Sequence, residues 1–319
     1  MEASEKTRLI EVARLYYEHD FSQLQIAKKI GISRPGVSRL LQTARETGIV
    51  KIEIIDPDAR GTQLEDSLRE KFGLKHAIVV PNDSDSSKIK ERLGSATVKY
   101  LQQLINPDMI LGVSWGSTMR EVAKHFSKNP VNGMVVVQLN GGVSKAEYDT
   151  HASEIAQRIG EKLWATPFLL PLPAIVDTPE LKNAILKDRN IARTLDYARN
   201  ASIAVYTIGL FNQDSVLVSA DYFDQKEIDD LLKNNAVADI CSRIITKGGR
   251  ICSKDLDNRT IGIELDELRK KKYSIAVAGG KEKFPAVLAG IRSGVFNVLV
   301  TDEYVASKLL TTEPIKGRN

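Results

Sequence analysis

The sequence predicts an α/β protein with two domains: a small all-α domain at the N-terminus and a larger domain built on a mostly parallel, doubly wound sheet. Three observations lead to this prediction. The chain has 319 residues, more than the ~250–300 that one hydrophobic core normally holds. Apolar residues recur at helical spacing up to residue 44, whereas from residue 76 on short β-rich runs alternate with helical patterns. Such alternation is typical of a parallel sheet covered on both faces, so we expect domains at 1–56 and 57–319.

The composition is that of an ordinary globular protein. Hydrophobic residues make up 42% and charged residues 27% of the chain, which excludes wholesale disorder. With 21 Gly, 11 Pro and 2 Cys, the collagen-like and disulfide-scaffold classes are excluded as well. Residues 165–176 form one of the longest apolar runs, but prolines interrupt it and it is shorter than the ~20 residues that cross a bilayer.

The compartment follows from the N-terminus and the cysteines. The first residues lack a basic stretch followed by an apolar core, so no secretory signal is expected. Cys241 and Cys252 suit a reducing environment, where we expect them to pack as small hydrophobes and not to form a bridge. We therefore predict a cytoplasmic protein that has no membrane partner.

The small domain is expected to begin with two helices. The first covers residues 6–19, where apolar side chains repeat at helical spacing. The second covers residues 22–30 and is broken by Gly31, which tolerates the positive φ of a tight turn. Ala27 is small enough to let another helix cross the second one closely.

A third helix follows this turn. Ser33 has the short hydroxyl of an N-cap, Pro35 is tolerated in a first helical turn, and Gly48 ends the helix. Residues 49–55 predict a strand, which would form a small wing. This is the pattern of a winged helix-turn-helix, and its shared core would comprise Ile26, Ile30, Val37 and Leu40.

The charge distribution indicates a DNA-binding role for this domain. The chain carries a net charge of +4. Residues 20–51 hold six Lys or Arg and two acids, so their balance of +4 accounts for the whole excess, as a DNA footprint should. The alternative is a three-helix cap whose basic residues are a solvated face. Because Arg can fork onto guanine and Gln onto adenine, we predict as DNA-contacting residues Gln23, Gln25, Ser33, Arg34, Val37, Ser38, Arg39 and Gln42.

The large domain is expected to start with a linker at 58–61 and a helix that Gly73 ends. Strands are predicted at residues 76–81, 109–114, 134–139, 203–208, 273–278 and 297–301. Helices are predicted between most of them, at 88–105, 118–126, 153–163 and 284–293. Residues 239–253 predict a hairpin whose turn lies at 247–249.

Three predicted strands end in loops rich in glycine and hydroxyl groups, at residues 113–118, 139–144 and 278–283. Open parallel sheets bind ligands beyond the carboxyl ends of their strands, and helix N-termini present free N–H groups to anions. Ser117, Thr118 and Lys283 would suit a phosphate. The alternative for each loop is ordinary turn chemistry. Neither G-x-G-x-x-G nor a P-loop is present, so NAD and ATP are disfavoured and no cofactor is expected.

Catalytic and metal sites have weaker support. His151 lies close to Asp149 and Ser153 in the sequence, but near-consecutive residues rarely form a triad. The His and Cys residues show no spacing typical of zinc. We therefore expect neither a metal site nor an enzyme.

Several motifs carry a resemblance to one family of bacterial proteins. They are ARLYY (13–17), QIA (25–27), ISR (32–34), VSRLL (37–41), GVSWG (112–116), QLNGG (138–142), DICSR (239–243) and VAGG (277–280). On these motifs the chain resembles the SorC family of transcriptional regulators over essentially its whole length. PLP (171–173) and RTIG (259–262) make it most similar, within that family, to the deoxyribonucleoside regulators.

The resemblance implies a sheet domain akin to sugar-phosphate isomerases, a phosphorylated-sugar effector, and a tetrameric repressor that releases its operator when the effector binds. It implies that Ser117, Thr118 and Lys283 hold the phosphate and that Asn140 and Asp239 face the sugar. The full set of expected effector-binding residues is Ser114, Gly116, Ser117, Thr118, Asn140, Gly141, Gly142, Asp239, Gly279, Gly280 and Lys283.

One position departs from the pattern of the deoxyribonucleoside regulators. Their pattern has a lysine, which forms a Schiff base with the sugar aldehyde, immediately before the two glycines, whereas this chain has Asn140. An amide nitrogen does not attack an aldehyde, so we expect a non-covalent effector. Lys145 and Lys281 are nearby in the sequence and are expected to be solvated surface charges.

We therefore predict a DNA-binding repressor of a carbohydrate or nucleoside catabolic operon, relieved by a phosphorylated sugar. We expect a homo-oligomer, either dimer or tetramer, because a helix-turn-helix binds tightly only through two half-sites. One alternative is an enzyme resembling sugar-phosphate isomerases or lactonases with an accessory nucleic-acid-binding domain. The other is a scaffolding protein that binds nucleic acid without sequence choice.

Overall fold

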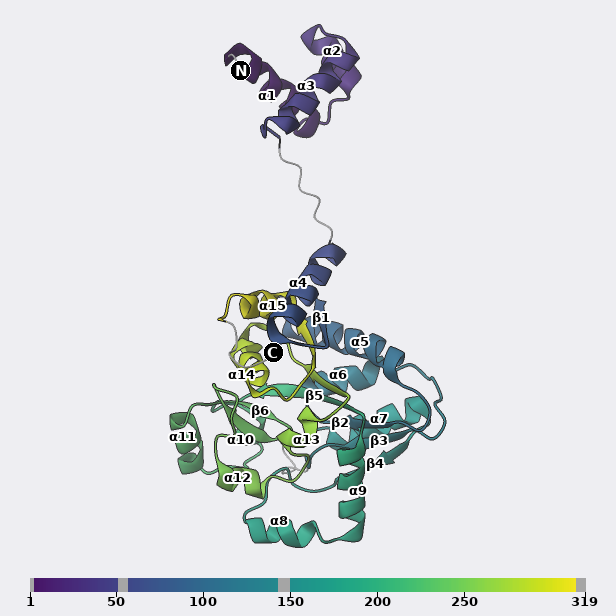
Figure 1. Ribbon diagram of the computed structural model, residues 1–319, viewed down its shortest axis with the longest axis vertical. Helices are drawn as coiled ribbons and strands as arrows, with labels where there is room; N and C mark the ends of the chain where they lie inside the picture. The colour runs from purple at the N-terminus through teal and green to yellow at the C-terminus, as the bar shows by residue number, and fades with distance from the viewer. Residues whose placement is uncertain (1–2, 51–56, 143–149, 314–319) are drawn as a thin grey trace. The chain divides into compact units, whose positions relative to one another are not determined.

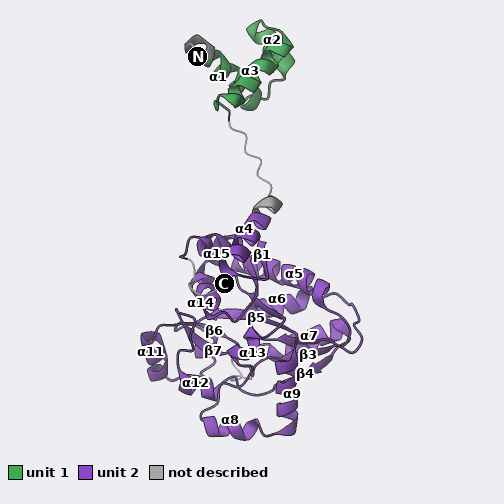
Figure 2. Ribbon diagram, in the orientation of Figure 1, with its two compact units in different colours: residues 1–57 green, residues 58–319 purple. Residues whose placement is uncertain are grey.

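The computed structural model describes residues 3–50, 57–142 and 150–313. The chain divides into two compact units, residues 1–57 and 58–319 (Figure 2). Each unit has its own hydrophobic core.

The small unit contains three helices: α1 (Ala3–Tyr17), α2 (Gln23–Ile30) and α3 (Arg34–Glu46). Ser22 begins α2 with a capping box, in which its hydroxyl accepts from the backbone N–H of Gln25 at 3.3 Å and its own N–H donates to Gln25 Oε1 at 2.9 Å. Gly31 ends α2 at φ +70°. Ser33 then caps α3 by accepting from the Gly36 N–H at 3.2 Å. The predicted helices, turn and cap are therefore confirmed.

The core of the small unit lies where the three helices meet. Val12 of α1, Ile26 of α2 and Val37 of α3 are completely buried there. Of the predicted wing strand 49–55, only the first two residues lie among the described ones, and Ile49 and Val50 form a bend after α3. The rest of that prediction lies outside the described residues.

The large unit is organised around a nine-stranded sheet (Figure 1). Seven strands run parallel in the order β1-β9-β8-β5-β2-β3-β4. An antiparallel pair, β6 and β7, extends from the carboxyl half of β5. The strands are β1 (His76–Val80), β2 (Ile110–Val113), β3 (Val135–Gln138), β4 (Thr166–Phe168), β5 (Ile203–Leu210), β6 (Ala236–Ile240), β7 (Arg243–Thr246), β8 (Tyr273–Val277) and β9 (Val298–Asp302).

Helices cover both faces of this sheet, as the doubly wound prediction requires. Alternate residues of a strand point to opposite faces, and neighbouring strand residues such as Val136 and Val137 belong to two different core clusters. The first cluster is closed by α5 (Ser86–Leu104), α6 (Ser117–His125) and α7 (Ala152–Leu163), which pack against one another (Figure 1). The second is closed by α4 (Pro57–Phe72), α9 (Arg189–Asn200), α13 (Leu265–Arg269), α14 (Phe284–Ser293) and α15 (Glu303–Leu310). The remaining short helices are α8 (Pro179–Ile185), α10 (Val216–Ser219), α11 (Gln225–Lys233), α12 (Lys254–Arg259) and η1 (Lys281–Lys283).

One prediction about the large unit is wrong, and another is confirmed. Residues 58–61 are not a linker, because α4 begins at Pro57, a residue well suited to the first turn of a helix. The predicted hairpin turn at 247–249 is confirmed by the antiparallel bridge between Ile245 and Ile251, while an earlier turn that was not predicted, Cys241–Ser242, joins β6 to β7. Residues 247–249 make a second turn after β7, where the Gly249 N–H donates to the Thr246 carbonyl at 2.8 Å.

The edge strand β4 was not predicted. It has only three residues, and its central residue is Pro167, which has no N–H to donate. It pairs with β3 on one side and ends the sheet on the other. Just before it, α7 ends at Trp164, a left-handed residue (φ 55°) whose surface is 75% exposed.

Candidate functional site

The outer face of α3 presents the predicted DNA-contacting residues. Arg34, Ser38, Arg39 and Gln42 are all exposed, while the opposite face is buried in the core of the small unit. This separation is what a helix needs in order to place one face in a DNA groove without losing its packing. Gln42 also donates to Glu46 at 2.9 Å.

The four other predicted DNA contacts have different surroundings. Val37 is 0% exposed, so its inclusion among the DNA-contacting residues is wrong: the side chain is enclosed by the small unit's core and cannot reach a base. The carboxamide of Gln25 is used in the capping box of α2. Gln23, the first residue of α2, is half-buried, and the Ser33 hydroxyl caps α3.

The large unit contains a cavity of about 210 Å³ at the carboxyl ends of its central strands. Ser114 follows β2, Asn140 follows β3, and Ala278 follows β8, while Thr207 belongs to the carboxyl half of β5. This is the edge at which open parallel sheets bind ligands. Of the predicted effector-binding residues, the cavity is lined by Ser114, Gly116, Ser117, Thr118, Asn140, Asp239, Gly279 and Lys283.

One wall of the cavity has the chemistry of an anion site. Gly116 stands at the N-cap of α6 with φ +116°, a conformation that favours glycine, and this N-cap residue has no side chain with which to cap the helix. Ser117 and Thr118 are its first two residues, so their hydroxyls and the helix N–H groups face the same region. Lys283 and Lys90 add two cationic side chains to the lining.

Lys283 is largely enclosed. Burial lowers the pKa of its amine, and the nearby carboxylates of Asp239 and Glu282 oppose that shift. An anion in the cavity would add to this opposition and stabilise the charged amine. Binding of an anionic ligand and protonation of Lys283 therefore favour each other.

Three predicted effector-binding glycines do not line the cavity. A Cβ on Gly141 would lie 2.3 Å from the Pro173 carbonyl oxygen, and a Cβ on Gly142 would lie 2.8 Å from the Trp115 ring. Gly280 donates its N–H to the Asp302 carboxylate. Gly141 and Gly142 therefore allow neighbouring segments to pack closely, which is a different use of glycine from close approach to a phosphate.

Asp239 is a half-buried carboxylate of the cavity wall. It lies on β6 directly opposite Gly209 of β5. Burial raises its pKa to about 6, while the Lys283 amine and a hydrogen bond from the Ser242 backbone act in the opposite direction. Since a protonated carboxyl donates and an ionised one only accepts, Asp239 can serve either role near neutral pH.

The floor of the cavity contains a chain of polar side chains that sequence reasoning found only in part. The Ser114 hydroxyl donates to Asn140 Oδ1 at 2.8 Å, and Asn140 Nδ2 donates to the Ser242 hydroxyl at 2.8 Å. Ser242 and Cys241 were missed because their turn contains no glycine or asparagine, the usual signals of a two-residue hairpin. Other lining residues that were missed include Lys90, Thr207, Gly209 and Glu282.

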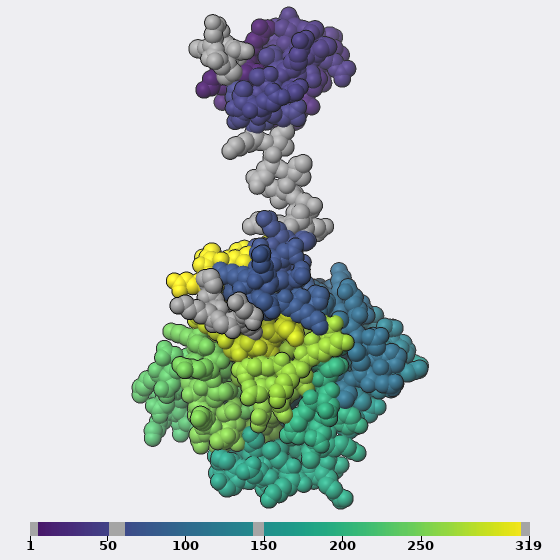
Figure 3. Space-filling model, viewed as in Figure 1, coloured from purple at the N-terminus to yellow at the C-terminus, as the bar shows by residue number. Residues whose placement is uncertain are grey.

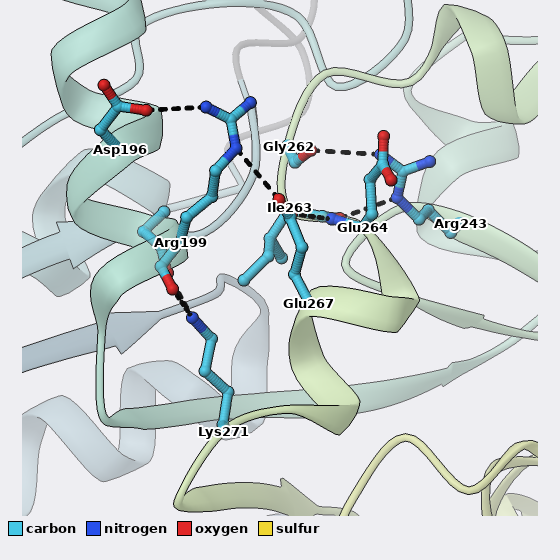
Figure 4. Close-up of polar contacts among 9 residues, drawn as sticks. Asp196, Arg199, Arg243, Gly262, Ile263, Glu264, Glu267 and Lys271 are labelled. Atoms are coloured by element: carbon cyan, nitrogen blue, oxygen red, sulfur yellow. Dashed lines mark hydrogen bonds and ion pairs between the residues drawn. The ribbon is translucent and has the colours of Figure 1, made fainter.

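Arg243 binds the segment 257–263, which lies next to this floor (Figure 4). Its side chain is 1% exposed and its guanidinium donates to the carbonyls of Ile263, at 2.8 Å, and Gly262, at 3.1 Å. It also forms an ion pair with Asp257. A buried arginine is tolerated because these partners satisfy its donors. The chain from Asp257 to Ile263 is thereby held against the strand that follows the cavity turn.

A second group of contacts holds the next helix, α13 (Figure 4). Arg199 of α9 pairs with Asp196 at 2.8 Å and with Glu267 at 3.0 Å. Lys271 donates to the carbonyl of Arg199 at the end of α9, and burial lowers the pKa of its amine to about 8. A cation at a helix C-terminus compensates the exposed carbonyls there.

Other candidate chemistry receives no support among the described residues. His151 pairs with Glu154 at 3.1 Å, and Asp149 lies outside the described residues. Both cysteines are free. The described part of the chain contains no group of three or more potential metal ligands and no helix long and apolar enough to cross a membrane.

Comparison with known proteins extends these observations. Residues 57–311 match the protein family described as "Putative sugar-binding domain". The "Deoxyribonucleoside regulator" of Bacillus subtilis (strain 168) is 41% identical over 312 residues, which cover 96% of this chain and 98% of the relative. The "Sorbitol operon regulator" of Klebsiella pneumoniae is 32% identical, with coverage of 97% and 100%. The crystal structure of the full-length sorbitol operon regulator from that organism has a TM-score of 0.73 and 29% identity over 97% of this chain and 100% of that one.

Proposed function

The chain belongs to the SorC family of transcriptional regulators, and from this membership we propose that it represses a carbohydrate or nucleoside catabolic operon and is released from DNA by a phosphorylated sugar. It is a transcriptional regulator with a sugar-binding domain and not an enzyme, because it aligns with transcriptional regulators over almost their whole lengths. The two-domain division at residues 56 and 57 would then separate DNA recognition from effector binding.

DNA recognition is assigned to the exposed face of α3. Arg34 and Arg39 offer guanidinium groups for guanine edges or phosphates, and Gln42 offers an amide for adenine. Ser38, between the two arginines, can contact a base or a phosphate, and the turn before α3 suits a phosphate. The operator would contain two half-sites, because one such helix makes too few contacts for specific binding.

The phosphorylated sugar is assigned to the large unit's cavity. The observation that carries this proposal is the meeting of an uncapped helix N-terminus with Ser117, Thr118 and two lysines at the carboxyl edge of the sheet. A phosphate needs this combination of N–H groups, hydroxyls and cations. Asp239 and Ser114 also line the cavity and suit sugar hydroxyls. An enzyme built on the same sheet is not favoured, because the relatives are regulators.

The test uses the full chain and a fluorescent fragment of the promoter upstream of its gene. Anisotropy should show tight binding that weakens when a phosphorylated sugar is added and persists with the unphosphorylated sugar. Lys283→Ala should remove the response to the phosphorylated sugar and leave DNA affinity intact. Equal responses to both sugars, or none to any phosphorylated sugar, would contradict the proposal.

We further propose that the regulator acts as a homo-oligomer in the cytoplasm. The reason is the number of half-sites that specific binding requires. Light scattering at micromolar concentration should give an even number of subunits. A monomer that still bound its operator tightly would contradict this part of the proposal.

A further inference from the structure

The floor of the effector cavity is built from three separate segments joined through one amide. Ser114 follows β2, Asn140 follows β3, and Ser242 belongs to the turn between β6 and β7. All three residues are buried, with exposures of 6%, 1% and 1%. The Asn140 carboxamide accepts from Ser114 and donates to Ser242, each at 2.8 Å.

Asn140 is itself clamped in place. Its backbone forms an antiparallel bridge with Gly262. Gly262 has φ +149°, and a Cβ there would lie 2.6 Å from Asn140 Cβ. The following residue, Gly141, donates its N–H to the Ile261 carbonyl at 3.0 Å. The backbone of Asn140 is fixed, and both its carboxamide oxygen and its carboxamide nitrogen are hydrogen-bonded to protein groups. Asn140 is therefore better placed to orient Ser114 and Ser242 than to contact a ligand itself.

The turn that carries Ser242 is unusual. Cys241 and Ser242 have φ values of 50° and 66°. Residues other than glycine, asparagine and aspartate are unfavourable in this left-handed region, and such a conformation persists only where the surroundings hold it. The hydrogen bond from Asn140 to the Ser242 hydroxyl helps to stabilise this turn. Because Asp239 lies three residues before Ser242, the same turn also fixes the carboxylate of the cavity.

The direction of the hydrogen bonds sets what the floor offers to a ligand. Ser242 accepts from Asn140, so its own O–H remains able to donate. Ser114 donates to Asn140, so its oxygen remains able to accept. Asp239 adds a carboxyl group. A donor beside acceptors matches adjacent hydroxyl groups, each of which both donates and accepts.

We propose that Asn140 is a positioning residue: it orients the hydroxyls of Ser114 and Ser242, which with Asp239 read two adjacent hydroxyls of the effector. This rests on the proposed function, in which the cavity takes a phosphorylated sugar. It also deepens it, because it names the ligand class as a sugar phosphate with a vicinal diol. The N-terminus of α6 binds the phosphate, and the β6–β7 turn selects the sugar.

The experiment is calorimetry on the full chain with inorganic phosphate and a panel of pentose and hexose phosphates, each paired with a deoxy analogue. The tightest sugar phosphate is then titrated into Asn140→Ala, Ser242→Ala and the double variant. Asn106→Ala is the control, because Asn106 precedes β2 and so lies at the opposite end of that strand from the cavity. Thermal melting checks that each variant is folded.

Each single variant should weaken the sugar phosphate about tenfold, the equivalent of one hydrogen bond, and leave inorganic phosphate within about twofold. The double variant should lose less affinity than the sum of the two single losses, because Asn140 acts in part through Ser242. The deoxy analogue should bind the wild-type chain about tenfold more weakly than the parent sugar phosphate. If Asn140→Ala does not fold, the pair Ser114→Ala and Ser242→Ala tests the same coupling, because the Asn140 amide joins these two hydroxyls.

Additive losses in the double variant would overturn the positioning role and make Asn140 itself a ligand contact. A deoxy analogue that binds as well as its parent sugar phosphate would overturn the proposal that the cavity recognises two adjacent hydroxyls. Both results leave the proposed function standing. Failure of the wild-type chain to bind any sugar phosphate would instead remove the proposed function, and this inference with it.

Discussion

Gly209 of β5 lies directly opposite Asp239 of β6, and a Cβ on Gly209 would stand 1.7 Å from Asp239 Oδ2. The Asp239 carboxylate therefore occupies the space that a side chain on Gly209 would fill. This contact decides whether Asp239 can lie in the cavity wall as observed.

We expect Gly209→Ala to destabilise the large unit by about 1–3 kcal/mol, as overpacking of a core does. Urea unfolding measures this. The second substitution Asp239→Ala should remove most of the loss, because it removes the atom that clashes. Gly248→Ala is the control, since its nearest neighbour, Thr246 Oγ1, would be 3.8 Å away. Equal effects of Gly209→Ala with and without Asp239 would contradict the clash.

The raised pKa of Asp239 predicts a pH-dependent stability. Burial raises this pKa to about 6 from the ordinary value of 3.8. Between these values the folded chain binds more protons than the unfolded chain, so stability is full below about pH 4 and falls as the pH rises through about 6. Asp239→Asn removes this loss and should be the more stable chain at pH 7.5, by about 1–3 kcal/mol at 1.36 kcal/mol per pKa unit.

Urea unfolding of both chains at pH 4 and pH 7.5, followed by tryptophan fluorescence, measures the difference. Both tryptophans lie in the large unit, so the signal reports on the fold that contains Asp239. An advantage of Asp239→Asn that is the same at both pH values would show that the titration of this carboxyl is not its cause.

Arg34→Ala and Arg39→Ala should each weaken operator binding by about 1–3 kcal/mol if the side chain reads a base, with relaxed specificity at one position. A phosphate contact would weaken all sequences alike and reduce the salt dependence. Anisotropy against the operator and single-base variants distinguishes the two. Arg14→Ala is matched in charge and lies on α1, where Arg14 pairs with Glu18. Full operator affinity in the Arg34→Ala, Arg39→Ala double variant would refute the assignment.

The effector should be held without a covalent bond. Borohydride treatment with deoxyribose phosphate should leave the intact mass unchanged, because Asn140 has no nucleophilic amine. Asn140→Lys is the positive control, since it places an amine before the two glycines. An adduct on Lys90 or Lys283, the lysines of the cavity lining, would contradict the prediction. Lys145 lies outside the described residues, and Lys281 is exposed in η1.

Local signals in the sequence were reliable where one residue type serves one geometry. Gly31 and Ser33 predicted the turn and the cap of α3, because left-handed backbone and an accepting hydroxyl are needed there. The alternation of apolar runs predicted most of the parallel strands, which are buried on both faces. Ser117, Thr118 and Lys283 were predicted to lie together because parallel strands bring their carboxyl ends to one edge.

Features that depend on tertiary contacts were not predictable. The Cys241–Ser242 turn carries no turn signature, since the surrounding floor and not its sequence holds it in the left-handed region. Gly141 and Gly142 were interpreted as ligand contacts, but what they allow is close approach of residues 172–173 and of Trp115. Val37 was predicted both as part of the small unit's core and as a DNA contact, and its burial confirms only the first prediction.

The two tryptophans of the large unit differ in their exposure to solvent. The outer surface of the large unit is formed by segments from α4 to α15 (Figure 3). Trp115, in contrast, is enclosed in the cavity wall and donates its indole N–H to the Gly141 carbonyl at 2.8 Å. The second of the two tryptophans, Trp164, is 75% exposed. The two indoles therefore emit from opposite environments, the buried one at shorter wavelength and the exposed one open to a collisional quencher. Trp164→Phe would leave a single fluorophore at the wall, whose emission follows the filling of the cavity without any added label.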